Sequence, residues 1–303
     1  MAFTAKDVQA LREKTGCGMM DCKKALTECN GDMDAAVDFL REKGLASQAK
    51  KASRVAAEGT VCAISENGVG VVVELNAETD FVAGGDEFKE LALKVAKVIA
   101  KQNPADVDAL LACKEGDQTV EEMVQELFLK VRENIKIRRF VRYEGKVVTY
   151  VHAGGKIGVM VNFDGDIDAE SADFITMGKN VAMQIAAMSP AYLDEASVPA
   201  EVIEKEKEIL IAQMKEDPKM ANKPEQVLGK IVEGKIGKYY KENCLVEQAF
   251  VMNGDITVGK YVADTAKELG CDIKLVSFVR MEKGEGIEKR VDDFAAEVAS
   301  MIK

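Results

Sequence analysis

The chain has 303 residues, of which 47% are hydrophobic and 31% charged, and its formal net charge is −11. This length suggests two or more domains with cores of their own, and the composition is that of a globular protein rather than a disordered one. The acidic balance argues against broad binding of nucleic acid or of anionic membranes, because both need patches of Lys and Arg.

The cysteines and the first residues predict a cytoplasmic protein. Seven cysteines without a CxxC pair fit reduced thiols better than a disulfide framework. The opening stretch has no apolar signal core, and no run approaches the roughly 20 apolar residues of a membrane helix. The spacings of Cys17, Cys22 and Cys29 match no zinc pattern, so these thiols are predicted to be small apolar filler. We expect neither a metal nor a cofactor.

Residues 1–46 are predicted to form three short helices. Thr4 and Asp7 have the spacing of a capping box, and Asp32 is placed to cap a third helix that ends at Gly44. A bundle of this size buries little apolar surface, so its expected role is to present a surface. The small and polar residues 46–54 are predicted to be a linker.

The middle of the chain contains an internal duplication with an offset of 86 residues. NGVGVVVEL and DEFKELALKVAKVIAKQNP in the first copy correspond to GGKIGVMVNF and ADFITMGKNVAMQIAAMSP in the second, so that Phe88 matches Phe174. Each copy is predicted to run strand, turn, strand, loop, helix. The fold class is therefore α+β, with core subdomains at 56–143 and at 144–195 together with 241–277.

The segment that ends the first copy is predicted to be a capped helix followed by a strand. Thr119 and Glu122 have the spacing of a capping box at the start of a helix that reaches Asn134. IKIRRFVRY then predicts a strand with Lys136, Arg138 and Arg142 on one face.

Residues 196–240 are predicted to form an inserted helical hairpin. Ser197 can cap its first helix, and Leu210 and Met214 belong to a narrow apolar seam among Glu and Lys. The residues from Glu216 to Pro224 are predicted to be its turn. Beyond the hairpin we expect strands at VEQAFVM and DIKLVSFVRM, a helix over Val258–Leu269, a final helix over Ile287–Ile302, and a small carboxy-terminal module over 278–303.

The sequence contains no recognisable catalytic motif. His152 is the one histidine, and a contact role fits it better than catalysis. GDITVGKY (Gly254–Tyr261) fits the glycine–lysine spacing of a phosphate loop, but Tyr261 stands where a Ser or Thr must reach Mg²⁺. A turn before a helix, with Thr257 as its cap, is the better interpretation. The sequence therefore predicts a binding protein rather than an enzyme.

Five stretches, in order, resemble the bacterial elongation factor Ts family. They are LREKTGCGMMDCKKALTECNGDMDAAVDFLREKG, VELNAETDFVAGGDEF, NIKIRRFVRYEG, HAGGKIGVMV and FVRMEKGEGIEKR. The resemblance covers essentially the whole chain. It implies a ubiquitin-associated-like amino-terminal bundle, two related core subdomains, an inserted hairpin that is a candidate for dimerisation, and a carboxy-terminal module that reaches the partner.

The same resemblance implies a function and a site. Family members bind elongation factor Tu in its GDP form, disturb the Mg²⁺ and phosphate site of this GTPase and promote GDP release. By the match, Phe81 is a wedge, Asp80 is a polar anchor, and Thr79 and Val82 shape the tip. Further partner contacts are implied for six residues: His152, Gly154, Gly155, Asp21, Lys23 and Lys24.

Two alternatives stay open from the residues alone. An aromatic side chain just past a strand commonly packs into its own core, which would remove Phe81 from any interface. The amino-terminal bundle alone would also fit a ubiquitin-binding or peptide-binding scaffold.

Gly84 and Gly85 replace the basic or amide residue usual in the family, and this pair is expected to loosen the turn.

Overall fold

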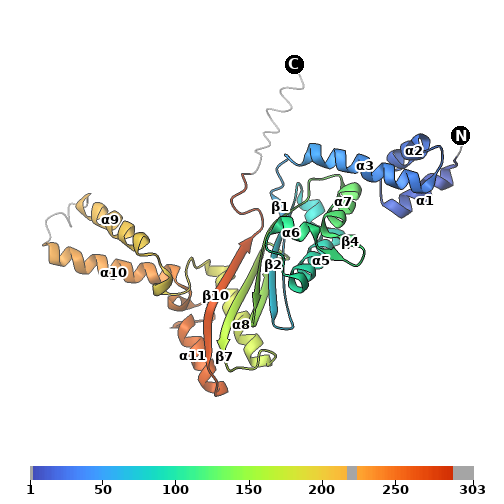
Figure 1. Ribbon diagram of the computed structural model, residues 1–303. Helices are drawn as coiled ribbons and strands as arrows, with labels where there is room; N and C mark the ends of the chain where they lie inside the picture. Colours follow the sequence, from blue (N-terminus) through green and yellow to red (C-terminus); the bar gives the residue numbers. More distant parts are fainter. Residues whose placement is uncertain (1–2, 217–223, 289–303) are drawn as a thin grey trace.

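The computed structural model describes residues 3–216 and 224–288, which form a mixed α+β protein with three amino-terminal helices and several small antiparallel sheets (Figure 1). The amino-terminal helices are α1 (Ala5–Thr15), α2 (Met19–Glu28) and α3 (Met33–Lys51). The predicted capping box of Thr4 and Asp7 is confirmed, and Asp32 caps α3. Cys17 and Cys22 are buried in the small core of this bundle.

The predicted end of the third helix at Gly44 is wrong. α3 continues to Lys51 and so includes most of the predicted linker. A Cβ atom on Gly44 would overlap the side chain of Leu129 on α7 (Val120–Val131). Gly44 therefore allows α3 to pass close to α7, and this tertiary contact rather than a helix stop explains the glycine.

The first sheet has the antiparallel order β1-β2-β5, and its strands are β1 (Glu58–Glu66), β2 (Val69–Ala77) and β5 (Lys136–Glu144). Alternate residues of β2 face α5 (Asp86–Gln102), where Phe88 is a large buried side chain. The remaining elements of this half are α4 (Asp80–Gly84), α6 (Val107–Ala112), β3 (Lys114–Glu115) and β4 (Gln118–Thr119).

The second sheet has the order β10-β7-β6, with β6 (Lys146–His152), β7 (Ile157–Gly165) and β10 (Ile273–Glu282). It packs against α8 (Ala172–Met188), which has 17 residues like α5 and starts 86 residues later in the chain. The predicted strand VEQAFVM is short, because only Ala249–Phe250 forms β8. β9 (Asn253–Thr257) pairs with it, and α11 (Val258–Leu269) has the predicted bounds.

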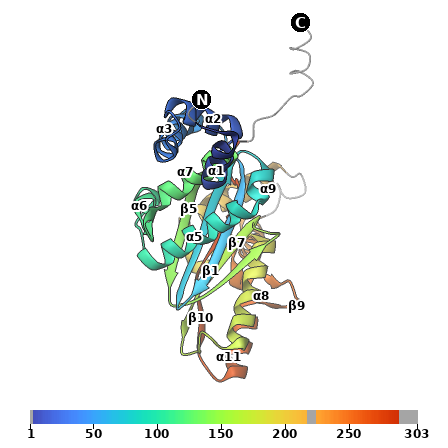
Figure 2. The ribbon, with the colours of Figure 1, turned by 90° about the vertical axis from the view of Figure 1, so that its right-hand side faces the viewer.

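The two sheets pack face to face, with α5 and α8 on their outer sides (Figure 2). Val61 and Val72 of the first sheet meet Val147, Met160 and Met281 of the second in a buried cluster. The Val61 N–H also donates a hydrogen bond of 2.8 Å to the Gly155 carbonyl. The buried cluster therefore holds the two sheets together.

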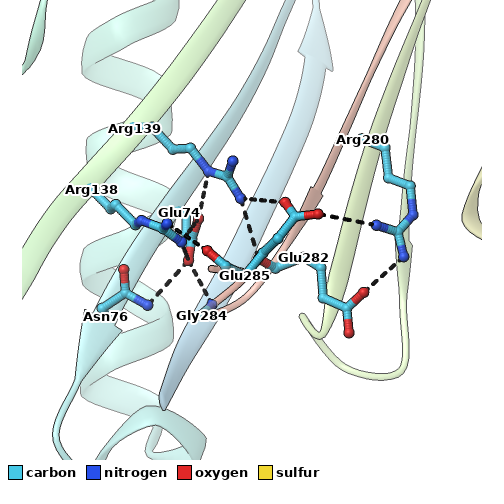
Figure 3. A network of polar contacts seen from close by, with 8 residues as sticks. All are labelled: Glu74, Asn76, Arg138, Arg139, Arg280, Glu282, Gly284 and Glu285. Atoms are coloured by element: carbon cyan, nitrogen blue, oxygen red, sulfur yellow. Dashed lines mark hydrogen bonds and ion pairs between the residues drawn. The ribbon is translucent and has the colours of Figure 1, made fainter. Parts of the chain in front are cut away.

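A fully buried carboxylate, Glu74, lies on this inter-sheet side of β2 (Figure 3). It accepts hydrogen bonds from Arg138 (3.0 Å), Arg139 (2.7 Å), the Asn76 side chain (3.2 Å) and the Gly284 N–H (2.7 Å). These partners come from β2, from β5 and from the turn after β10. Glu74 therefore ties the chain near residue 284 to the first sheet.

The prediction that Lys136, Arg138 and Arg142 share one face of β5 is wrong. A bulge pairs Glu74 with Arg139 and the next residue of β2 with Ile137, so Arg138 is the extra residue. Two neighbouring arginines then reach the same carboxylate. Arg142 lies on the other side, where its Nε atom donates to the Ala100 carbonyl at 3.2 Å.

The environment of Glu74 predicts a pH dependence. Burial disfavours its charge, but hydrogen bonds from Gly284, Arg139, Arg138 and Asn76 outweigh burial and hold the pKa of Glu74 below its ordinary value. A folded pKa below the unfolded one means that the stabilisation is complete above the unfolded pKa of about 4.3 and is lost as pH falls through the folded pKa. Between about pH 5 and pH 3, urea titrations should show a steeper loss of unfolding free energy in the wild type than in Glu74→Gln. Equal slopes would contradict this assignment.

The hairpin is formed by α9 (Ala200–Glu216) and α10 (Glu225–Asn243), and it lies on the opposite side of the sheets from the amino-terminal bundle (Figure 1). Its predicted seam is confirmed, since Leu210 and Met214 pack against Val232 and Ile236. Ser197 does not cap α9; its hydroxyl donates to Asp194 in a preceding turn.

Three predictions fall largely outside the described residues. Residues 217–223 of the predicted hairpin turn, Glu216–Pro224, lie outside the described residues, and most of the predicted final helix and of the carboxy-terminal module lies beyond residue 288. Residues 287 and 288 themselves are not helical. Within the described ranges, no helix combines the length and the apolar character needed to cross a membrane.

Candidate functional site: an exposed aromatic tip

The candidate site is α4, a five-residue helical turn between β2 and α5. Thr79 caps it, because its Oγ1 atom accepts a hydrogen bond of 3.3 Å from the Val82 N–H. Ala83 is buried and Val82 is half-buried against the core beneath α5. Phe81 points the other way, with 87% of its surface exposed. The alternative that Phe81 packs into its own core is therefore wrong.

The structure corrects the expected conformation of this tip. Residues 80–84 form a turn of helix rather than an irregular turn, and the Gly85 N–H closes it by donating to the Val82 carbonyl at 3.0 Å. Neither Gly84 nor Gly85 has a positive φ. A left-handed backbone is therefore not the reason for this pair of glycines.

His152 and the two glycines after it lie at the turn between β6 and β7. His152 is exposed, and its Nδ1 atom lies 2.9 Å from the Tyr150 hydroxyl. Gly154 is also exposed, with a φ of 63°. Gly155 is buried at a φ of 102°, where a Cβ atom would overlap the Thr60 hydroxyl of β1. The turn thus presents His152 and Gly154, and Gly155 seats it against the first sheet.

Gly155→Ala is expected to destabilise the fold by about 2 kcal/mol or more, because it adds both backbone strain and overpacking. Gly84→Ala is the matched control: its Cβ atom would have no neighbour within 4 Å, and its backbone is not left-handed. This control should stabilise by roughly 0.5 kcal/mol. Urea unfolding of both variants measures the difference, and equal changes in unfolding free energy would refute the packing role of Gly155.

The implied contacts of the amino-terminal bundle divide into two kinds. Lys23 and Lys24 are exposed on α2. Asp21 instead forms a 2.8 Å ion pair with Arg132 at the end of α7. Asp21 thereby links the bundle to the first half of the core.

The other sequence motifs form no catalytic arrangement in the described residues. Residues 254–257 of the phosphate-loop pattern lie in strand β9, Thr257 caps α11 as predicted, and Lys260 pairs with Asp264 at 2.8 Å. Burial raises the pKa of Cys62 to about 11, so this thiol stays protonated at neutral pH. Across residues 3–216 and 224–288, no group of three or more His, Cys, Asp or Glu residues could hold a metal ion.

Comparison with known proteins shows to which family the chain with this tip belongs. A family model described as Elongation factor TS matches residues 78–285, which begin beside Thr79 and end just after Gly284, a partner of Glu74. The chain belongs to the elongation factor Ts family. Proteins named Elongation factor Ts from Syntrophotalea carbinolica, Clostridium perfringens strain SM101 and Clostridium botulinum strain ATCC 19397 are 49%, 51% and 48% identical to it. These alignments cover 98–100% of this chain and 97–100% of each relative.

Membership of the elongation factor Ts family makes the chain a nucleotide exchange factor for elongation factor Tu and not an enzyme. The resemblance seen in the sequence is thereby confirmed, and a ubiquitin-binding scaffold does not describe the chain as a whole. Sequence reasoning missed Glu74 and Glu133. A carboxylate inside the apolar run VVVEL was a signal for Glu74. No local signal marked Glu133, which lies between α7 and β5.

Proposed function

We propose that this chain acts in the cytoplasm, where it binds elongation factor Tu–GDP and releases the nucleotide through the α4 tip. Phe81 is the wedge that enters the GTPase, Asp80 is its polar anchor, and Thr79 and Val82 hold its shape. The observation that carries this proposal is the exposure of Phe81, 87%, on a turn whose neighbours Val82 and Ala83 pack inward. An exposed aromatic on a fixed base is typical of an interface anchor.

The mechanism follows from linkage. A translational GTPase holds GDP through backbone N–H groups around the phosphates and through Mg²⁺. An exchange factor that binds best to a state with a disturbed Mg²⁺ site must weaken GDP binding, and GDP must weaken factor binding by the same factor. Insertion of Phe81 beside that site supplies the differential contact, because the side chain leaves water only in the complex.

Further contacts extend the interface. His152 and Gly154 present a second surface at the β6–β7 turn, where the buried Gly155 fixes the turn. Lys23 and Lys24 supply positive charge from the bundle, and Asp21 orients the bundle through Arg132. These groups are proposed to contact the GTPase directly or, for Gly155 and Asp21, to place the residues that do. We expect no direct contact with nucleic acid and none with a membrane.

The domain organisation is part of this proposal. The bundle of residues 1–46 is ubiquitin-associated-like, and 56–143 and 144–195 with 241–277 are copies of one subdomain. The shared strand order and the equal lengths of α5 and α8 support the duplication. Residues 196–240 are an inserted hairpin available for dimerisation, and 278–303 are a carboxy-terminal module. The boundary at 277/278 falls within β10, so that module begins as part of the second sheet.

The test is nucleotide release from elongation factor Tu loaded with a fluorescent GDP. The purified chain should accelerate release in Mg²⁺-containing buffer, and excess GDP should dissociate the complex of the two proteins. A release rate equal to that of the GTPase alone would refute the proposal.

A further inference from the structure

Glu133, which lies in the short segment between α7 and β5, holds the cap of the α4 tip. Its Oε2 atom accepts a hydrogen bond of 3.0 Å from the Thr79 N–H, and its Oε1 atom accepts one of 2.7 Å from the Thr79 hydroxyl. The Thr79 hydroxyl proton therefore points at Glu133, which leaves an Oγ1 lone pair for the Val82 N–H. One carboxylate thus fixes both donors of the residue that starts α4.

Glu133 is itself held on both sides. The Arg132 N–H donates to the Phe128 carbonyl at 2.8 Å, and the Arg132 side chain pairs with Asp21. The Asn134 N–H donates to Glu78 at 2.7 Å, and the buried Asn134 side chain donates to the carbonyl of Arg54 at 2.7 Å. The backbone at Glu133 is therefore fixed relative to the end of β2, and the Glu133 carboxylate is held in a defined position beside the tip.

A five-residue helix has little stability of its own, since one turn must pay the full cost of helix nucleation. The order of α4 depends on the packing of Val82 and Ala83 and on the cap at Thr79. The cap depends on Glu133, and hydrogen bonds to a charged acceptor are stronger than neutral ones. Loss of Glu133 therefore frees the start of α4, and with it the direction of Phe81, while the core beneath stays intact.

We propose that Glu133 is a positioning residue for nucleotide exchange. It acts through Thr79 and presents Phe81 in the orientation that enters the GTPase. This inference rests on the proposed function of the tip, since it assigns a determinant of the same site. It adds to the exchange machinery a residue that lies 54 positions away from Thr79 in the chain.

The experiment compares four variants of the full chain: Glu133→Ala, Glu133→Gln, Phe81→Ala and the control Glu90→Ala. Glu90 is an exposed carboxylate on α5, away from Thr79 in the chain. Stopped-flow release of fluorescent GDP from elongation factor Tu is measured against factor concentration, which separates the saturating rate from the half-saturating concentration. Hydrogen exchange at the Val82 amide and the melting temperature are measured on the free factors.

Glu133→Ala should lower the saturating rate about tenfold, the effect of losing one charge-assisted interaction. The half-saturating concentration and the melting temperature should stay near wild type, and the Val82 amide should lose protection while β2 amides keep theirs. Glu133→Gln retains one carbonyl acceptor and should fall between Glu133→Ala and the wild type, and Glu90→Ala should match the wild type.

An unchanged saturating rate in Glu133→Ala, or a loss that follows the melting temperature, would overturn the inference, provided that Phe81→Ala is slow. If the Phe81→Ala factor promotes GDP release at the wild-type rate, the proposed function of the tip fails instead. An unchanged protection of the Val82 amide in Glu133→Ala would also overturn the inference, whatever the rates.

Discussion

Phe81→Ala should lower the rate of factor-catalysed GDP release about a hundredfold and leave the melting temperature of the free factor unchanged. Burial of a phenylalanine side chain is worth about 3 kcal/mol, and each 1.36 kcal/mol of barrier changes a rate tenfold. The side chain is exposed in the free factor, so its removal takes no contact from the core. Stopped-flow fluorescence gives the rate, and thermal unfolding gives the stability.

A matched control separates a wedge from a general loss of apolar surface. Met252 is 58% exposed at the turn between β8 and β9, in the second half of the molecule. With the Met252→Ala factor, elongation factor Tu should release GDP as fast as with the wild-type factor. If Phe81→Ala and Met252→Ala slow release equally, or if Phe81→Ala unfolds the factor, the wedge role of Phe81 is wrong.

Glu74→Ala should lower the unfolding free energy by about 3 kcal/mol, because it removes the counter-charge that two arginines share and leaves Arg139 only its more exposed pair with Glu285. Arg138 and Arg139 both point at Glu74, and the Gly284 N–H loses its acceptor as well (Figure 3). Urea unfolding measures the change in unfolding free energy. Glu74→Gln, which keeps the shape and removes the charge, serves as the variant to measure if the alanine form does not fold.

The control for Glu74 is an ion pair at the surface. Lys260 and Asp264 pair at 2.8 Å on α11, with side chains 59% and 47% exposed. Asp264→Ala should cost less than about 1 kcal/mol, because water and salt screen exposed pairs. A loss for Glu74→Ala as small as that for Asp264→Ala would show that the buried network is not a main support of the fold.

The sequence predicted those parts of the fold that depend on local patterns. The capping signals at Thr4, Asp32 and Thr119 are confirmed, and α11 has the predicted bounds, because cap and periodicity are set within a few residues. The predictions were wrong where the structure depends on contacts between residues far apart in the chain. Gly44 stays inside a helix because Leu129 lies against it, and the bulge at Arg138 depends on pairing with β2.

The site also has a part that the sequence predicted and a part that depends on distant contacts. The motif around Phe81 was recognisable from the sequence through its resemblance to a family, while composition alone favoured a buried aromatic. The exposure of Phe81 follows from the inward packing of Val82 and Ala83, which fixes the rotation of α4. Glu133 escaped prediction because its link to Thr79 spans 54 positions and exists only once α7 and β2 are packed.

Phe81 is proposed to act by disturbing the Mg²⁺ site of the GTPase, and the most direct test is the Mg²⁺ dependence of the Phe81→Ala defect. GDP release from elongation factor Tu is measured with wild-type factor and with Phe81→Ala, once in millimolar Mg²⁺ and once with the metal chelated. With Mg²⁺ present, we expect Phe81→Ala to slow GDP release about a hundredfold. This defect should largely disappear after chelation, because the Mg²⁺ site that Phe81 disturbs is then already empty. A defect of the same size in both conditions would show that Phe81 does not act through the Mg²⁺ site.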